Sequence, residues 1–230
     1  MESLANLAYQ YKNMIWIGVR VTIVVSVLSV LLGFVFGTLI CFMKISKNKV
    51  LNTIGTVYVE IIRGTPVLLQ ISMVYYGLPL MGLHMPSITF MGFSVDKLIC
   101  GILALTINSS AYVSEIVRSG IQSIDKGQRE AALSLGLEKT DVMRFIIMPQ
   151  AIKNILPALG NEFVNLIKTS SQVSIIGLAD LMYTANVIRG NSFRPFAPLV
   201  IVAVLYLILT FSTSSLVRNV EKRFNRSSAN

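Results

Sequence analysis

The sequence contains few charged residues and few of the residues that carry catalytic or metal chemistry. Only 13% of its 230 residues are Asp, Glu, Lys or Arg, whereas 53% are hydrophobic, a balance that is not typical of soluble domains. It has a single histidine, His84, and two cysteines, Cys41 and Cys100. One histidine and two cysteines are too few for a Cys/His metal cluster, and they leave only one histidine for a Ser-His-Asp triad. We therefore expect no metal site and no catalytic residues.

The sequence also lacks the G-x4-G-K-[ST] phosphate loop, which excludes ATP binding in the P-loop manner. Without a phosphate loop or catalytic residues, we expect a protein that is not itself an enzyme and binds no cofactor. If this chain transports a solute against its concentration gradient, the energy must come from a partner ATPase or from an ion gradient. Cys41 and Cys100 lie within or beside long apolar runs, where free thiols usually act as small apolar fillers.

Long uncharged runs are abundant. Residues 21–43, 64–95, 98–114 and 195–217 contain no Asp, Glu, Lys or Arg, and a fifth, weaker run is interrupted by Glu162 and Lys168. About 20 helical residues cross a bilayer. The pattern predicts an all-α integral membrane protein with a single domain over residues 1–230. The five predicted transmembrane helices cover roughly 15–43, 60–82, 97–117, 154–178 and 195–217.

The formal net charge of +9 is distributed unevenly along these predicted helices. Most of the basic residues fall between the first and second spans, between the third and fourth, and after the fifth. By the positive-inside rule, this distribution predicts an N-terminus outside and a C-terminus inside. It also favours the lipid bilayer over nucleic acid as the partner of the basic residues. The residues are Lys44, Lys47, Lys49, Arg63, Arg118, Lys126, Arg129, Lys139, Arg144, Lys153, Arg218, Lys222, Arg223 and Arg226.

Two local signals lie in the first two predicted spans. Ser29, Gly33 and Gly37 recur at four-residue spacing, a stripe of small residues that allows another helix to approach closely. A lipid-facing helix with incidental glycines is the alternative. In the second span, Thr65 and Pro66 have the sequence of a helix N-cap followed by a first helical residue.

A charged loop over residues 119–150, between the third and fourth predicted spans, contains a gapped pattern. It reads Glu130-Ala131-Ala132, three residues, Gly136, nine residues, Ile146, two residues and Pro149. The alanines and leucines among the charges favour a short helix with one apolar face, and the glycine allows a sharp turn into a second short helix. On this pattern alone, an ordinary cytoplasmic loop of mixed charge is equally compatible.

The gapped pattern resembles the EAA signature of the membrane subunits of ATP-binding-cassette (ABC) importers, with Met148 where that family usually has Leu. The stretches 60–70 (EIIRGTPVLLQ), 75–79 (YYGLP) and 161–177 (NEFVNLIKTSSQVSIIG) resemble polar-amino-acid permeases of the same family. The resemblance extends over essentially the whole chain, from the first predicted span to the basic tail.

The resemblance implies a function and a set of partners. It implies the permease subunit of an ATP-driven bacterial importer for polar amino acids, of the glutamine, arginine, histidine or cystine class, in the cytoplasmic (inner) membrane. Alternating access would be coupled to two ABC ATPase subunits that bind ATP and Mg²⁺. The other implied partners are a second permease subunit, in a homo- or heterodimer, and an extracytoplasmic amino-acid-binding protein. The implied ATPase-coupling residues are Arg129, Glu130, Ala131, Ala132, Leu133 and Gly136.

Polar and ionisable residues recur on the third and fourth predicted spans, where lipid does not favour them. One explanation is a solute pathway; the other is packing against a second permease subunit, or pairing of Glu162 with Lys168 or with neighbours of Glu115. In many relatives an acidic residue follows Lys168, whereas this chain has Thr169, which leaves the finer substrate class open. The candidate pathway residues are Asn108, Tyr112, Glu115, Asn161, Glu162, Asn165, Lys168, Thr169 and Gln172.

A self-contained secondary transporter or channel is the alternative function. It requires an intramembrane ion site and no ATPase, and many such transporters contain inverted repeats, which are not visible in this sequence. A membrane scaffold, a third class, leaves the polar residues of the fourth span unexplained. The sequence therefore favours the importer permease.

Overall fold

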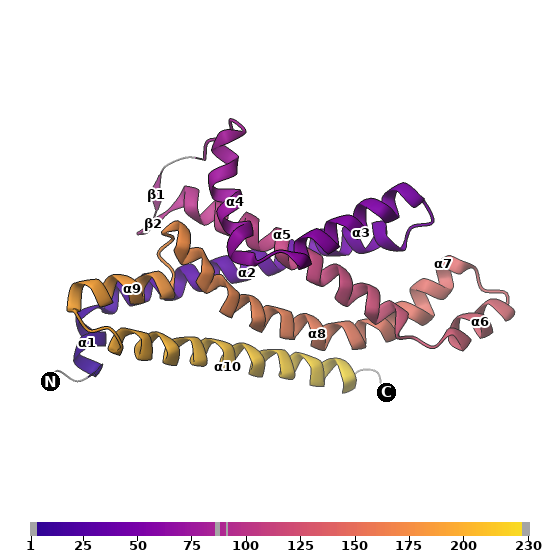
Figure 1. The fold of residues 1–230 in the computed structure, drawn as a ribbon. Helices are drawn as coiled ribbons and strands as arrows, with labels where there is room; N and C mark the ends of the chain where they lie inside the picture. The colour runs from indigo at the N-terminus through magenta and orange to yellow at the C-terminus, as the bar shows by residue number, and fades with distance from the viewer. Residues whose placement is uncertain (1–3, 86–87, 91, 227–230) are drawn as a thin grey trace.

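The computed structural model describes residues 4–85, 88–90 and 92–226, which form a helical chain with one very short β-ladder (Figure 1). The helices are α1 (Leu4–Gln10), α2 (Lys12–Ile45), α3 (Lys49–Gly64), α4 (Val67–Leu80), α5 (Val95–Gln122), α6 (Lys126–Ser134), α7 (Lys139–Asp141), the π-helix η1 (Val142–Ile147), α8 (Met148–Thr169), the 3₁₀-helix η2 (Ser170–Ile176), α9 (Leu181–Ser192) and α10 (Ala197–Arg226). The strands β1 (Thr89–Phe90) and β2 (Phe93–Ser94) pair antiparallel in the connection before α5.

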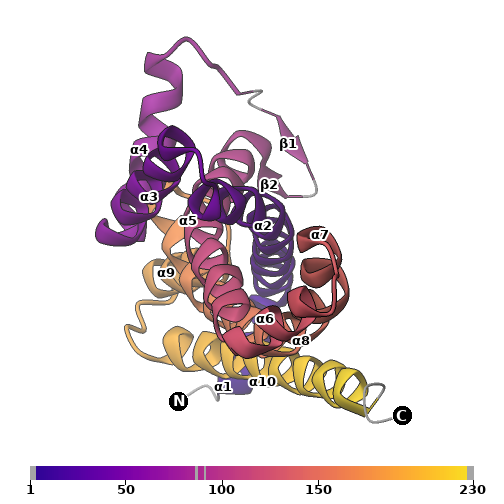
Figure 2. The same cartoon turned by 90° about the vertical axis from the view of Figure 1, so that its right-hand side faces the viewer.

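The long helices form a bundle in which α2 packs on α5, α5 on α8, and α8 on α10. Helices α1 and α9 lie at one end of this bundle. The α2–α3 turn, helices α6 and α7 and the end of α10 lie at the other end, as Figures 1 and 2 show. Helix α4 leaves the bundle steeply. The predicted all-α class is confirmed, and the motif loop lies at the same end of the bundle as two other basic segments, the α2–α3 turn and the end of α10.

The stripe of small residues on α2 allows a close contact with α5. Gly33 and Gly37 are buried against α5. A Cβ atom on Gly33 would lie 2.7 Å from Ser109 Oγ, and one on Gly37 would lie 2.7 Å from the Ser110 carbonyl oxygen. Side chains larger than hydrogen would therefore separate α2 from α5. The predicted close approach is confirmed, and the lipid-facing alternative for these glycines is wrong.

The second predicted span, 60–82, is broken rather than continuous. The chain bends by 107° between α3 and α4, and among the residues that the structure describes three helices are long and apolar enough to cross a membrane, or four if this bent pair is one span. Thr65 is the C-cap of α3, not the N-cap of α4, and its hydroxyl donates back to the Ile61 carbonyl oxygen at 2.9 Å. Pro66 precedes the first helical residue instead of occupying that position. Thr65 is extended because proline disfavours helical geometry in the residue before it, so α3 ends here.

The fourth predicted span, 154–178, differs in both its start and its regularity. Helix α8 begins at Met148, and after Thr169 the chain continues as the 3₁₀-helix η2 up to Gly177, whose φ is +73°. Helix α8 is not one of the three individually apolar candidates. The other three predicted spans fall within α2, α5 and, for residues 197–217, α10.

Asp180 and Leu181 together join three helices at the α9 end of the bundle. It is fully buried, and its carboxylate accepts hydrogen bonds from the backbone N–H groups of Met182 and Tyr183, which caps α9. The Tyr206 hydroxyl of α10 lies 3.3 Å from the same carboxylate, and Thr22 of α2 accepts a bond from the Leu181 N–H. This polar junction fixes α9 across the ends of α2 and α10.

Candidate functional site

The predicted coupling segment folds into two short helices joined by a left-handed glycine. Asp125 caps α6, because its carboxylate accepts a bond from the Gly127 N–H at 2.7 Å. Gly136 has a φ of +86°, a conformation that favours glycine, and its N–H donates to the Leu133 carbonyl oxygen at 3.0 Å. The Leu137 N–H closes the turn on the Ala132 carbonyl oxygen. The turn predicted at Gly136 is confirmed.

Some apolar residues of this segment pack against the rest of the protein, and others are exposed. Ala132 is buried against Val142 and Ile147, and Leu133 packs on the same cluster, so these two side chains hold α6 to η1. Leu135, at 84% exposure, points outward, and so do the side chains of Arg129, Glu130 and Ala131. The exposed surface available to another protein therefore combines two opposite charges with one large apolar side chain.

A π-helical segment connects α7 to α8, and Pro149 at the end of the motif explains it. Proline has no N–H to donate to the carbonyl oxygen four residues earlier, that of Phe145. The chain adopts the wider π-helical turn over Val142–Ile147, and the Gln150 side-chain amide donates to the Ile146 carbonyl oxygen at 2.7 Å. The motif thus determines both ends of the connection, the tight turn at Gly136 and the wide turn before Pro149.

Gln70 bridges the break between α3 and α4. Pro66 cannot donate to the Ile62 carbonyl oxygen, because it has no N–H. The Gln70 side-chain amide replaces that donor at 2.7 Å and also lies 3.1 Å from the Thr65 carbonyl oxygen. Its own carbonyl oxygen accepts a bond from the Asn108 amide of α5 at 3.0 Å. One buried side chain therefore holds the bent helix pair against the bundle, and sequence analysis had not identified it.

We expect Gln70→Leu to destabilise the chain by about 2 kcal/mol, because it leaves the buried Asn108 amide without its acceptor and removes the side-chain donor from the half-buried Ile62 carbonyl oxygen. The free cysteines Cys41 and Cys100 are both buried, so a thiol-reactive fluorescent dye reports thermal unfolding directly. Gln128→Leu, on the exposed face of α6, is the matched control and should not change the midpoint. An unchanged midpoint for Gln70→Leu would show that the bridge contributes nothing to stability.

The three polar residues predicted on the third span have separate partners in the structure. Asn108 bonds to Gln70, and the Tyr112 ring lies 5.5 Å from the Arg63 guanidinium. Glu115 bonds to Lys44 of α2 and accepts a bond from Arg118 at 2.7 Å. The three side chains therefore connect α5 to α4, α3 and α2 respectively.

Some of the predicted polar residues of the fourth span are exposed and others are buried. Asn161, Asn165 and Lys168 are exposed along one face of α8, whereas Glu162 is buried. The Thr169 hydroxyl donates back to the Asn165 carbonyl oxygen at 3.0 Å, and Gln172 is half-buried in η2.

Neither ion pair considered for Glu162 forms among the side chains that the structure describes, where the two recorded ion pairs both involve Glu115. The pairing of Glu162 with Lys168 is wrong for a geometric reason. Residues six positions apart lie on different faces of a helix, whereas partners three or four apart lie on one.

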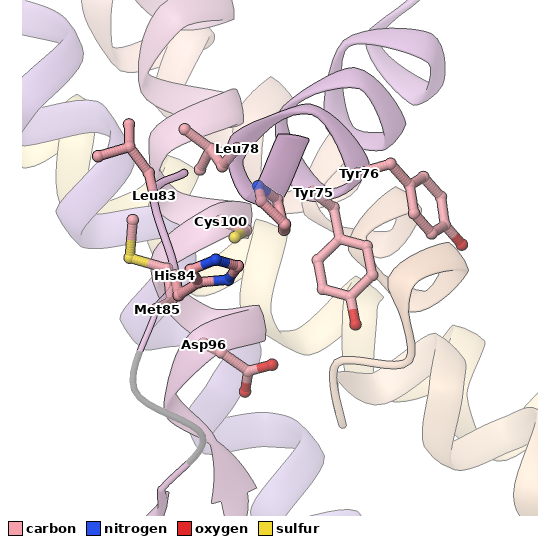
Figure 3. Close-up of a pocket in the computed structure, with 9 residues that line it drawn as sticks. Tyr75, Tyr76, Leu78, Leu83, His84, Met85, Asp96 and Cys100 are labelled. Atoms are coloured by element: carbon pink, nitrogen blue, oxygen red, sulfur yellow. The ribbon is translucent and has the colours of Figure 1, made fainter. Parts of the chain in front are cut away.

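A cavity of about 400 Å³ lies where α4 ends and α5 begins, away from the motif loop. Figure 3 shows the His84 imidazole, the Cys100 thiol and the Asp96 carboxylate on one side of the Tyr75 ring, while Tyr76 points away from them. The carboxylate and the aromatic ring suit a small polar or cationic group. Among these residues only the single histidine and Cys100 stood out in the sequence, and no local pattern connects them, because they come from α4, the following loop and α5.

The comparison with protein families covers nearly all of these elements. Residues 29–226 match the family model of the binding-protein-dependent transport system inner membrane component. The chain belongs to this family. It is therefore a membrane-embedded transport subunit and not a catalytic enzyme, and the resemblance seen in the EAA-like loop is confirmed for the chain as a whole.

Individual members of this permease family are similar to this chain over almost its full length. A putative glutamine transport system permease protein, GlnP of Rickettsia bellii, is 39% identical over 206 residues, which cover 90% of each chain. The arginine transport system permease protein ArtQ of Bacillus subtilis is 37% identical over the same share. A solved structure described as an amino acid ABC transporter with histidines is 41% identical, covers 97% of this chain and 99% of its own, and has a TM-score of 0.87.

Proposed function

We propose that this chain is the permease subunit of a bacterial ABC importer for polar amino acids. The observation that carries the proposal is the exposed, two-helix form of the EAA-like segment at one end of an apolar bundle. Its relatives named for glutamine and arginine transport, and its similarity to a solved amino acid ABC transporter, support the substrate class.

The proposed topology has five membrane crossings, namely α2, the bent pair α3–α4, α5, α8 with η2, and α10. The N-terminus lies outside and the C-terminus inside a bacterial inner membrane. The basic residues support this orientation, because the α2–α3 turn, the α6–α7 segment and the end of α10 gather at one end of the bundle (Figure 1). The bent pair counts as one crossing, with Gln70 satisfying the backbone at its break.

The assembly we propose contains a second permease subunit, two ABC ATPase subunits and an extracytoplasmic amino-acid-binding protein. Helix α4 supports the second permease, because Leu69, Met73 and Tyr76 are exposed on a helix that leaves the bundle. The ATPase subunits would bind ATP and Mg²⁺, since this sequence lacks a phosphate loop. They would dock on the exposed surface of α6 and its C-cap, formed by Arg129, Glu130 and Leu135.

Coupling in this proposal depends on how α6 is joined to the bundle. Ala132 and Leu133 pack on η1, and η1 continues directly into α8. Movement of α6 with an ATPase would therefore be transmitted to α8, whose exposed Asn161, Asn165 and Lys168 we assign to the solute pathway. Asn108, Tyr112 and Glu115 would then act by positioning neighbouring helices around that pathway.

ATP hydrolysis by the assembly tests this function. The chain would be purified with its cognate ATPase in lipid nanodiscs and assayed with a binding protein loaded with each polar amino acid in turn. Stimulation by a loaded receptor, and not by the empty one, is the expected result and identifies the substrate. If no ATPase co-purifies and the chain alone transports amino acids in proteoliposomes under an ion gradient, the secondary transporter replaces the importer.

A further inference from the structure

A groove with almost purely apolar walls opens on the side of the bundle between α2, α3 and α5. Its volume is about 370 Å³, and its walls include Phe36, Ile40 and Met43 of α2, Ile54 of α3, and Leu103 and Ile107 of α5. At its base the Tyr58 hydroxyl lies 3.0 Å from the Ile107 carbonyl oxygen and 2.7 Å from Ser110 Oγ. These two hydroxyl groups are bonded to one another and to the backbone, and the hydroxyl of Thr106, the third polar residue of the lining, is buried away from the groove surface. The surface offered to a ligand is therefore hydrocarbon.

The walls of the groove are accessible from outside the chain. Phe36 is 50% exposed and Ile54 is 53% exposed. They are continuous with an apolar outer face of α2 to which Leu32, Val35 and Leu39 contribute. Because α2 is a candidate membrane span, this face and the groove lie at the depth of lipid hydrocarbon.

The α2–α3 turn places positive charge at one end of the groove. Met43 and Ile54 line the groove on either side of this turn, which contains Lys47 and is followed by Lys49, the first residue of α3. Both lysines are exposed, and the ion pairs recorded among the described side chains involve neither of them. The distance along α2 from Met43 to Phe36 is about 10 Å, at a rise of about 1.5 Å per residue. An apolar groove therefore extends along α2 from an end that carries two lysines with no recorded ion pair.

We propose that this groove binds one acyl chain of an anionic phospholipid, whose phosphate lies over Lys47 and Lys49. Basic residues at the cytoplasmic ends of helices attract anionic headgroups, and the apolar walls complement the tail. An apolar helix from another subunit would fill the walls but would offer no charge to the two lysines. The inference depends on insertion of α2 and α3 in the bilayer and not on the transport reaction.

Tryptophan quenching by brominated lipid tests the site directly. Trp16 is the single tryptophan of the chain, so Trp16→Phe with Phe36→Trp places one fluorophore in the groove. The full chain would be reconstituted in vesicles containing increasing fractions of dibrominated phosphatidylglycerol or dibrominated phosphatidylcholine. We expect half-maximal quenching at a roughly tenfold lower fraction of the phosphatidylglycerol. Lys47→Gln with Lys49→Gln should remove this preference.

Two controls make the result specific to the groove. Trp16→Phe with Phe211→Trp places the fluorophore on the lipid-exposed face of α10, where both lipids should quench equally. The Trp16→Phe parent supplies the background from any co-purified subunit. Absence of quenching in the groove, with normal quenching on α10, would overturn the proposal in favour of a protein occupant. Equal quenching of the groove probe by both lipids would also overturn it, because the lysines would then select no headgroup.

Discussion

Gly136→Pro is expected to abolish the coupling of ATP hydrolysis to transport while leaving the chain in the membrane. Proline fixes φ near −65°, whereas Gly136 has a φ of +86° and donates its N–H to the Leu133 carbonyl oxygen. Loss of the left-handed turn costs on the order of 1 to 3 kcal/mol. A change of that size shifts the local equilibrium by roughly tenfold to a hundredfold. Since α6 is exposed and attached through this turn, its orientation changes while the bundle, which does not include Gly136, is unaffected.

The measurement is the number of amino acid molecules transported per ATP hydrolysed in proteoliposomes that contain the whole assembly. Gly136→Asn is the matched control, because asparagine adopts the left-handed conformation far more readily than other side chains and should retain most of the coupling. The amount of chain recovered in the membrane fraction should be the same for both variants. Normal coupling by the proline variant, or its failure to insert, would remove α6 from the mechanism we propose.

The turn at Gly136 and the close-packing face of α2, though not its partner α5, could be predicted from sequence because both depend on short-range patterns. A glycine three residues after a run of helix formers indicates a helix end whatever the rest of the chain does. Small residues at four-residue spacing fall on one helix face by the geometry of the helix itself. The same is true of the long apolar runs, which predicted α2, α5 and most of α10 closely.

The bent helix pair and its bridge depend on contacts that short-range patterns do not contain. Pro66 marks a helix break, but the 107° angle is fixed only when Gln70 reaches both the end of α3 and Asn108. Asn108 lies 38 positions from Gln70 in the sequence. Likewise, Asp96, Tyr75 and His84 line one cavity because the fold brings the end of α4 close to the start of α5. Sequence alone could identify Asn108 as unusual in a membrane helix, but not its partner.

Glu115 illustrates how the structure changes the meaning of a predicted pathway residue. Its carboxylate is recorded in ion pairs with Lys44 and Arg118, and the Lys44 and Glu115 side chains are only 10% and 19% exposed. We expect Glu115→Leu to destabilise the chain by about 2 to 3 kcal/mol, because it leaves the Lys44 ammonium nearly buried without a counter-charge. The thermal unfolding midpoint, read from the reactivity of Cys41 and Cys100, should fall by several degrees.

A double-mutant cycle separates this structural role from a role in solute binding. Lys44→Met with Glu115→Leu removes both buried charges, so it should be more stable than Glu115→Leu alone. Arg118 is 32% exposed and bonds to Gln122, so its charge can be solvated without Glu115. If the double variant regains stability and receptor-stimulated hydrolysis together, Glu115 acts by joining α2 to α5. If stability returns and transport does not, the Glu115 carboxylate contacts the solute, and the pathway extends along α5 as well as α8.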